Sequence, residues 1–248
     1  MAGIPASSRR RTDLVTADSH YQGHDLEALS DLPNYHAWIL DGFAPYLGGR
    51  AVEIGAGVGT IARKIAPLVE SLDVVEPADN LQAPLAETLA GSGITIHHGS
   101  LEQWLAAAEP ASCDSIVMVN VLEHVADDRC ALVELRRALR PGGHLLLFVP
   151  ALPALFSPMD EALGHHRRYT LDELVGKVVD VGFSVRTAGY RDFLGVLAWW
   201  LVHRVMGNTG FNRSAARFYD RVGVPLTRGL ERLIGAPVGK NILLVARA

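Results

Sequence analysis

The sequence has few cysteines and no excess of basic residues. Its 248 residues include only Cys113 and Cys130. Cys113 opens an apolar run and Cys130 falls in a helical pattern, so we expect two buried, reduced thiols rather than a disulfide framework or a cysteine-ligated metal. Lysine and arginine number 23 against 27 acidic residues, which gives a formal net charge of -4. This balance lacks the basic surface that nucleic-acid binding requires.

Long hydrophobic runs are also missing. The apolar run from Phe193 to Val202 is about half as long as a bilayer-spanning helix, which needs about 20 residues. Arginines at positions 9–11 are not followed by an apolar segment, so we expect no signal peptide and a cytoplasmic location. Hydrophobic residues nevertheless make up 49% of the chain, which is enough for the core of one elaborated domain.

From position 50 onward, short apolar runs alternate with segments of helical periodicity. This rhythm predicts βαβ units and a parallel sheet, that is, an α/β fold. The predicted strands are 51–54, 72–75, 94–97, 115–119, 144–149, 184–188 and 242–246, and the predicted helices are 60–69, 80–90, 101–108, 127–139 and 171–181.

Four further segments surround this alternation. Residues 1–24 lack periodicity and predict a flexible N-terminus, and residues 25–47 predict a helix that Pro33 divides. Residues 150–170 contain three prolines and a cluster of histidine, arginine and tyrosine, which predicts a lid. Residues 192–234 predict a helical insertion before the last strand. We therefore expect one functional domain over residues 25–248.

A glycine-rich turn, E-I-G-A-G-V-G over residues 53–59, directly follows the first predicted strand. Glycines there permit a tight turn and a close approach of the backbone to a ligand. The carboxylate of Glu53 suits a ligand with an amino group at that end, such as S-adenosylmethionine (SAM). It would repel the pyrophosphate of a nicotinamide dinucleotide, so a nucleotide-linked oxidoreductase is disfavoured.

Polar motifs follow the next three predicted strands as well. Glu76 and Pro77 end the second strand, about 20 residues past the glycines, where an acid can accept both hydroxyls of a ribose. After the third strand, Ser100 could bond the edge of an adenine and Leu101 could contact its face. The run N-V-L-E-H-V over residues 120–125 follows the fourth strand.

In order and spacing these motifs resemble those of class I SAM-dependent methyltransferases, specifically the methyltransferase 11, 12 and 23-like families. The resemblance covers residues 50–150 and implies a Rossmann-like, seven-stranded, mostly parallel sheet whose last strand is antiparallel. SAM would lie across the carboxyl ends of the first four strands. The residues that the resemblance implies for SAM binding are Glu53, Gly55, Ala56, Gly57, Glu76, Pro77, Ser100, Leu101, Asn120 and Val121.

A methyl acceptor must be aligned with the methyl group, and a hydroxyl acceptor must also lose a proton. His124 is one candidate base, and its alternative role is structural, at the start of a helix. In ubiquinone-pathway O-methyltransferases this region includes acidic metal contacts. Here Asn120 occupies a place where those enzymes commonly carry an acid, so we expect no metal.

The run G-H-H-R-R-Y over residues 164–169 is the second candidate for the acceptor side. Its His165 could act as the base, and Tyr169 could orient that base or bond the acceptor. The arginines at positions 167 and 168 could bind an anionic group of the acceptor. Alternatively, ion pairs with Asp160 and Glu161 only fix this loop in place.

Aromatic residues on two other segments suggest contacts with the ligands. Tyr21, Tyr35 and Trp38 could close over a sulfonium cation, although core packing is an equal alternative for Trp38. The apolar run 193–202 predicts either a buried cap over the acceptor or an interfacial helix with Trp199 and Trp200 at the level of lipid headgroups. Both readings suit an apolar acceptor.

The sequence therefore predicts a SAM-dependent methyltransferase that acts on a small, apolar or aromatic acceptor and favours oxygen. The alternatives are an N-methyltransferase of a small metabolite, which needs no strong base, and a SAM-binding module without catalysis. An N-P-P-Y type motif is missing at residues 120–123, which disfavours methylation of nucleic-acid bases or of glutamine. The expected partners are a small-molecule acceptor and a peripheral membrane contact, without nucleic acid; the sequence leaves the oligomeric state undetermined.

Overall fold

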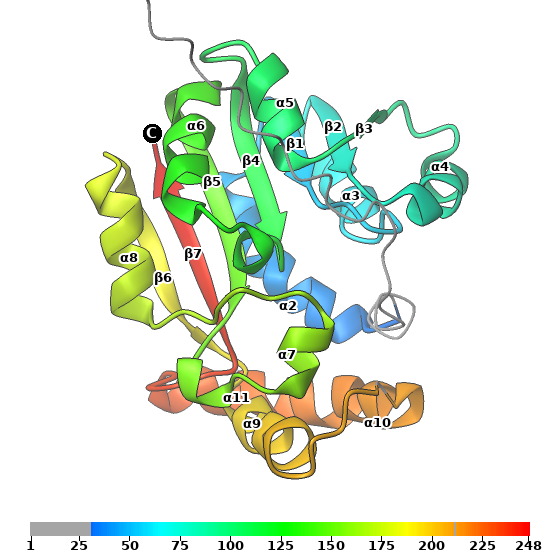
Figure 1. The fold of residues 1–248 in the computed structure, drawn as a ribbon, viewed down its shortest axis with the longest axis vertical. Helices are drawn as coiled ribbons and strands as arrows, with labels where there is room; N and C mark the ends of the chain where they lie inside the picture. The colour runs from blue at the N-terminus through cyan, green and yellow to red at the C-terminus, as the bar shows by residue number, and fades with distance from the viewer. Residues whose placement is uncertain (1–30, 211) are drawn as a thin grey trace, which may run out of the picture.

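A seven-stranded sheet forms the centre of the computed structural model, which describes residues 31–210 and 212–248. The predicted flexible N-terminus (1–24), Tyr21 and residues 25–30 of the first predicted helix lie outside the described residues. The strand order is β3-β2-β1-β4-β5-β7-β6 (Figure 1). Strands β1 to β5 pair in parallel, and β7 runs antiparallel to both of its neighbours.

All seven predicted strands are present, so the prediction of a Rossmann-like, mostly parallel sheet is confirmed. The inner strands are buried on both faces, which explains their near-continuous apolar sequence, whereas the two edge strands are mostly exposed or half-buried. The strands are β1 (Arg50–Ile54), β2 (Ser71–Glu76), β3 (Thr95–His98), β4 (Cys113–Val119), β5 (Leu139–Pro150), β6 (Ser184–Arg191) and β7 (Asn241–Arg247).

Most helices of the described residues begin at a side-chain cap or at a proline, whereas α3 and α4 have neither. Pro33 is the first residue of α2, a position where its missing N–H costs nothing, so α2 begins at the point where the sequence predicts a division. The bounds are α2 (Pro33–Phe43), α3 (Ala62–Ile65), α4 (Gln82–Leu89), α5 (Leu101–Ala107), α6 (Asp128–Ala138), α7 (Pro158–Ala162), α8 (Leu171–Asp180), α9 (Phe193–Trp199), α10 (Arg213–Phe218) and α11 (Val224–Ile234). Two π-helical turns, Trp200–Val205 and Tyr219–Gly223, extend α9 and connect α10 to α11.

Two hydrophobic clusters separate the helices into layers. One cluster joins Leu132 of α6 to Met118 of β4, and the other joins Phe43 of α2 to Phe148 of β5. Successive residues of a strand point to opposite faces, so the five inner strands contribute to both clusters, whereas the edge strands β3 and β6 contribute to one each. Burial of each such side chain stabilises the fold by about 1.5–3 kcal/mol.

The helical insertion predicted at 192–234 is present as α9, α10 and α11. These helices lie together beyond the carboxyl ends of the parallel strands, at the same end of the sheet as α7 (Figure 1). Among the described residues, no helix combines the length and apolarity needed to cross a membrane.

One expectation about the cysteines is wrong. Cys113 is buried in β4, as predicted, but Cys130 is exposed on α6. The inward positions of α6 are Ala131, Leu132, Leu135 and Ala138, and the helical period turns position 130 away from this stripe.

Candidate active site

The glycine-rich turn leaves β1 with three backbone conformations that favour glycine. Gly55, Gly57 and Gly59 all have positive φ, at 75°, 57° and 82°. A Cβ on Gly55 would also clash with Cγ2 of Val121, so the loop after β4 closes directly over this turn. The amides of Gly55 and Ala56 both donate to the carbonyl of Val75, which ties the turn to β2.

The carboxylate of Glu76 closes the turn from the end of β2. Its Oε2 accepts the N–H of Gly57 at 2.7 Å, and its Oε1 accepts the N–H of Ala78 at 2.9 Å. Burial raises the pKa of Glu76, and the two backbone hydrogen bonds oppose that rise. Each carboxylate oxygen can accept more than one hydrogen bond, so the group retains acceptor capacity for a ribose.

Glu53 is a buried carboxyl that lacks a full set of partners. Its Oε2 has no hydrogen-bond partner among the described residues. Burial, and then the nearby charge of Glu76, raises the pKa of Glu53 well above its usual value. An unpartnered buried carboxyl is costly, and a ligand ammonium would stabilise its charged form. The residues of this turn therefore fit the methionyl end of SAM.

The remaining residues predicted to bind SAM lie at the same edge of the sheet. They differ in burial and in whether they already have hydrogen-bond partners within the protein. Ser100 caps α5: its hydroxyl accepts the N–H of Gln103, whose side chain accepts the Ser100 N–H. Leu101 is buried in the core and Pro77 is exposed. Asn120 has a φ of 53°, which turns the chain away from β4 toward Val121. Their contacts with adenine or the amino group stay predictions.

His165 is oriented by a buried carboxylate that we did not single out as a catalytic candidate. Its Nδ1 lies 2.9 Å from Oδ1 of Asp160, and Nε of Arg168 donates to the same oxygen at 2.7 Å. The other oxygen of Asp160 accepts the N–H and the hydroxyl of Ser157. Burial raises the pKa of Asp160, but the hydrogen bond from His165 and the charge of Arg168 lower it overall. An ionised carboxylate only accepts hydrogen bonds, so Nδ1 of His165 carries the proton and Nε2 presents a lone pair.

The lone pair on Nε2 of His165 faces two residues of the loop after β4. Nε2 lies 3.9 Å from Oε1 of Glu123, and the ring of His165 meets that of His124 edge-on with centroids 4.7 Å apart. The Glu123 carboxyl is fully buried, and neither of its oxygens has a hydrogen-bond partner among the described residues. Burial raises the pKa of Glu123 to about 8.

Glu123, His124 and His165 could together hold a cation, since one ligand atom from each lies within 4.8 Å of the others. A carboxylate with two imidazoles suits several divalent transition metals. We expected no metal from the sequence, because the acid common at position 120 is absent. In the structure His165, from a distant segment, lies where it could be the third donor.

The environment of His124 combines partial exposure with a crowded ring. The residue is exposed at the surface, yet the protein atoms packed around the ring, and then His165, lower its pKa. The edge-on contact with the ring of His165 also disfavours a second positive charge. His124 is therefore a neutral imidazole near pH 7.

Tyr169 and Arg167 are not positioned for the roles considered from the sequence. Tyr169 is fully buried, and its hydroxyl donates to Asp128 at 2.9 Å and to the carbonyl of Leu122 at 3.2 Å. Arg167 pairs with the same Asp128 carboxylate at 2.8 Å. Tyr169 therefore anchors the 150–170 segment rather than contacting His165 or an acceptor, and its predicted catalytic role is corrected to a structural one.

The sequence also allowed that ion pairs with Asp160 and Glu161 only fix this loop in place. Within the part of the chain that the structure describes, such an ion pair is present for Asp160 and not for Glu161. Arg168 is buried and pairs with Asp160, and it also donates to the carbonyl of Ala151. Glu161 is exposed and forms no ion pair among the described residues. Neither arginine of the run is thus available to bind an anionic acceptor.

The apolar run 193–202 contributes one tryptophan to the interior and one to the surface. The Nε1–H of Trp199 donates to the carbonyl of Leu155 at 3.2 Å, and the guanidinium of Arg168 lies 4.5 Å from the centre of its ring. Trp200 is 46% exposed. The segment therefore covers the 150–170 segment with one side and leaves the other side in solvent.

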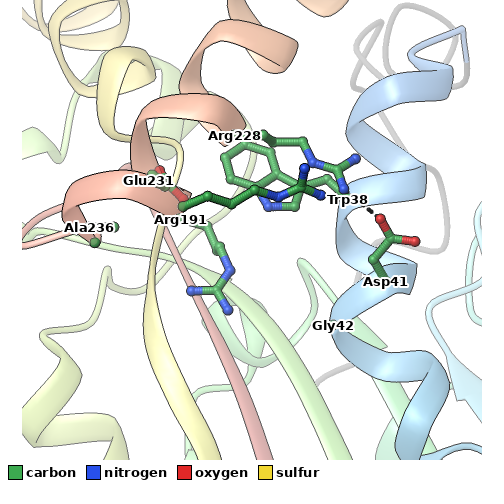
Figure 2. Close-up of a pocket in the computed structure, with 9 residues that line it drawn as sticks. Trp38, Asp41, Gly42, Arg191, Arg228, Glu231 and Ala236 are labelled. Carbon is green, nitrogen blue, oxygen red and sulfur yellow. Dashed lines mark hydrogen bonds and ion pairs between the residues drawn. The ribbon is translucent and has the colours of Figure 1, made fainter.

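The aromatic residues of α2 belong to the core and to a separate surface cavity. Tyr35 is buried and donates to Asn241 at 2.8 Å. Trp38 contributes to a cavity of about 370 Å³ between α2, the end of β6 and α11 (Figure 2). Apart from Trp38, no residue that the sequence places at the cofactor or the acceptor lines this cavity. The candidate site therefore lies at the loops after β1, β2 and β4, where the unpartnered carboxyls of Glu53 and Glu123 are, and not at this cavity.

Comparison with known proteins agrees with this geometry. Residues 52–147 match the family described as a methyltransferase domain. The ubiquinone biosynthesis O-methyltransferase of Cupriavidus pinatubonensis is 30% identical over 127 residues, which cover 50% of this chain and 50% of that protein. The chain thus matches about half the length of this curated relative.

Two solved structures share the fold over most of the chain. A protein described as a putative sarcosine dimethylglycine methyltransferase from Galdieria sulphuraria superimposes with a TM-score of 0.59 at 17% identity, over 87% of this chain and 85% of that one. Phosphoethanolamine N-methyltransferase 2 of Haemonchus contortus, in complex with SAM, gives 0.59 at 18% identity, over 86% and 52%. Residues 52–147 are therefore similar to a methyltransferase domain, and the chain shares the fold of these two methyltransferase structures.

Proposed function

We propose that the protein transfers the methyl group of SAM to an oxygen atom of a small, apolar or aromatic acceptor. The observation that carries this proposal is the hydrogen bond from His165 to buried Asp160, which leaves Nε2 of His165 as a base. An oxygen acceptor needs such a base, whereas an amine does not. The O-methyltransferase relative in ubiquinone biosynthesis supports an aromatic acceptor.

The glycine turn and its two acids would hold the cofactor. Glu53 would pair with the ammonium group, the backbone of residues 55–57 would approach the methionyl part, and Glu76 would accept the ribose hydroxyls. When bound there, SAM supplies an electrophilic methyl group on a sulfonium centre, set for in-line displacement. The chain's own task is to align the acceptor with that centre and to exclude water.

His165 performs the proton transfer in this proposal. Nε2 takes the proton of the acceptor hydroxyl as the new oxygen–carbon bond forms and the sulfur–carbon bond breaks. Asp160 stabilises the resulting imidazolium and is itself held by Arg168 and Ser157. The 150–170 segment thus acts as a fixed wall of the acceptor site, with His165 pointing from it toward Glu123.

The test is transfer of label from methyl-labelled SAM to matched acceptors. We would compare an alkylated catechol with its amine analogue, and then a host metabolite extract partitioned between water and organic solvent. The proposal expects labelled catechol ether in the organic phase and little labelled amine. Equal labelling of the amine would favour N-methylation, and SAM binding without labelling of any acceptor would favour a non-catalytic binding module.

A further inference from the structure

Exposed apolar side chains gather on the helical insertion, residues 193–234. It carries ten of the fourteen large hydrophobic residues that are exposed in the described part of the chain. Isolated exposed hydrophobics are normal, but a cluster of this size marks an interaction site. The ten are Leu197, Trp200, Leu201, Val205, Met206, Phe218, Val222, Leu226, Leu233 and Ile234.

The same segment carries charge opposite to the rest of the chain. It contains six arginines against two acids, Asp220 and Glu231, a formal net charge of +4. Because the whole chain sums to -4, the remaining residues sum to -8. Asp220 is buried and hydrogen-bonded to the N-terminal end of α2, so it screens little of the outer surface.

On helix α11 the exposed apolar residues and the arginines form two adjacent stripes. Leu226, Leu230 and Leu233 follow the i, i+4, i+7 spacing that places side chains on one helix face. Arg228 and Arg232 form a second row, and the inward row is Val224 and Thr227, which are buried. A helix that keeps one apolar row facing solvent, beside a basic row, has the pattern of helices that lie in a membrane interface.

Helix α9 and its π-helical extension also place an exposed apolar row beside an arginine. Leu197, Leu201 and Val205 are exposed at i, i+4, i+8 spacing, with Arg204 beside them. On the other side, Trp199 and His203 face inward toward the 150–170 segment. Because α9, α10 and α11 form one layer at one end of the molecule (Figure 1), their exposed residues are available to a single extended partner.

Two of the arginines near α11 are already engaged within the protein. Figure 2 shows Arg228 over the ring of Trp38, where it also pairs with Asp41 at 2.5 Å. Arg191, at the end of β6, donates to the carbonyl of Tyr190 and lies near Glu231. Arg204, Arg221 and Arg232 are exposed and pair with no carboxylate among the described residues, so they are the charges that an external anion would meet.

We propose that the 193–234 insertion binds the surface of a bilayer that contains anionic lipids. The apolar rows would enter the headgroup–acyl boundary while the unpaired arginines meet lipid phosphates. A second copy of the chain suits this face less well, because a two-fold interface would bring two segments of net charge +4 together. Vesicle binding needs neither SAM nor an acceptor, so the proposal stands apart from the proposed function.

The test is flotation of the full chain with vesicles of phosphatidylcholine alone or mixed with phosphatidylglycerol. We expect binding to the mixed vesicles that weakens as salt rises. The variant Leu233→Ser with Ile234→Ser should lower partition at least roughly tenfold. Its matched control is Val133→Ser with Val179→Ser, which removes two exposed hydrophobics outside the insertion and should bind like the wild type.

A second pair of variants tests how much the arginines contribute to vesicle binding. Arg221→Gln with Arg232→Gln should lower partition to the anionic vesicles roughly 10- to 30-fold, whereas Arg63→Gln with Lys64→Gln, on exposed positions of α3, should not. Equal binding of the insertion variants and the wild type would overturn the proposal. So would a wild type that ignores vesicles and elutes as a dimer which Leu233→Ser with Ile234→Ser dissociates, because the face would then be a protein interface.

Discussion

Nδ1 of His165 lies 2.9 Å from Oδ1 of Asp160, and the side chain of Asp160 is wholly buried. This pair fixes the imidazole tautomer and directs Nε2 toward the loop after β4. Nε of Arg168 donates to the same oxygen at 2.7 Å. The acceptor chemistry that we propose depends on this arrangement.

We predict that His165→Ala lowers kcat for methyl transfer by roughly 100- to 10,000-fold, the usual contribution of a general base. Binding of S-adenosylhomocysteine, measured by calorimetry, should stay unchanged, since His165 lies outside the cofactor turn. His166→Ala, on the next and exposed residue, is the matched control and should keep wild-type turnover. Full activity of His165→Ala would exclude it as the base, and a loss in His124→Ala alone would move that role to His124.

Glu76→Ala should weaken binding of S-adenosylhomocysteine, because two ribose hydrogen bonds to a charged acceptor would be lost at about 1.5–3 kcal/mol each. The change also removes the acceptors of the Gly57 and Ala78 amides, which loosens the turn. Glu70→Ala, at an exposed position just before β2, serves as the control. Unchanged affinity in a folded Glu76→Ala protein would refute the ribose assignment.

Tyr169→Phe should destabilise the fold by about 1–3 kcal/mol, since buried Asp128 loses a hydrogen-bond donor. Turnover per folded molecule should remain close to that of the wild type. Urea denaturation gives the stability and kcat gives the second quantity. Tyr46→Phe removes a hydroxyl that makes no hydrogen bond within the described residues and is the comparison variant. A large fall in kcat without loss of stability would restore a catalytic role for Tyr169.

Glu123 should make stability depend on pH. Its pKa rises from 4.5 to about 8 on folding, so the folded protein keeps a proton that the unfolded chain releases. This contribution is complete below pH 4.5 and is lost as the pH rises through about 8. Glu123→Gln should therefore gain stability over the wild type between pH 5 and pH 8, by a few kcal/mol at about 1.4 kcal/mol per pKa unit.

The measurement for Glu123 is urea denaturation of both proteins across this pH range with a chelator present, because a bound cation would keep the carboxylate charged. Glu161→Gln, at an exposed position nearby, should follow the wild-type curve at every pH. If the plots of unfolding free energy against pH run parallel for the wild type and Glu123→Gln, the carboxyl of Glu123 is ionised in the folded protein throughout this range.

Chelation should leave methyl transfer intact, since the pair of His165 and Asp160 supplies the base without a Lewis acid. We would measure kcat after dialysis against EDTA and again after addition of Mg²⁺ or Mn²⁺. Activity that disappears and returns with the metal would contradict this expectation. It would make Glu123, His124 and His165 the ligands of a catalytic cation.

Local chemistry made much of the fold predictable. Each strand is a short apolar run, and the turn after β1 requires residues that tolerate positive φ, so both are visible in a few consecutive residues. Glu53 and Glu76 could be placed at one edge because parallel strands end together. Pro33 also has a local signature, because a proline at the first position of a helix gives up no hydrogen bond, and α2 begins at this residue.

The arrangement of side chains from distant segments could not be predicted in this way. Tyr169 looks like a site residue beside His165 in sequence, but the isolated bridge between Ala151 and Tyr169 buries its ring and brings its hydroxyl to Asp128. Asp160 looks like one acid of a charged loop, yet folding makes it the partner of His165. Cys130 shows the same limit, since one helical position decides whether a thiol is buried.

The sequence by itself determined the α/β fold, the glycine-rich turn and the acids beside it, because backbone conformation and strand order follow from local patterns of glycine, charge and hydrophobicity. Only the tertiary structure decided which candidates meet: it brought Glu123 to His165, buried Arg168 against Asp160, and left the apolar rows of α9 and α11 in solvent. These outcomes depend on how whole elements dock. The free energy of docking is summed over many contacts between distant residues, and no single segment of the sequence records it.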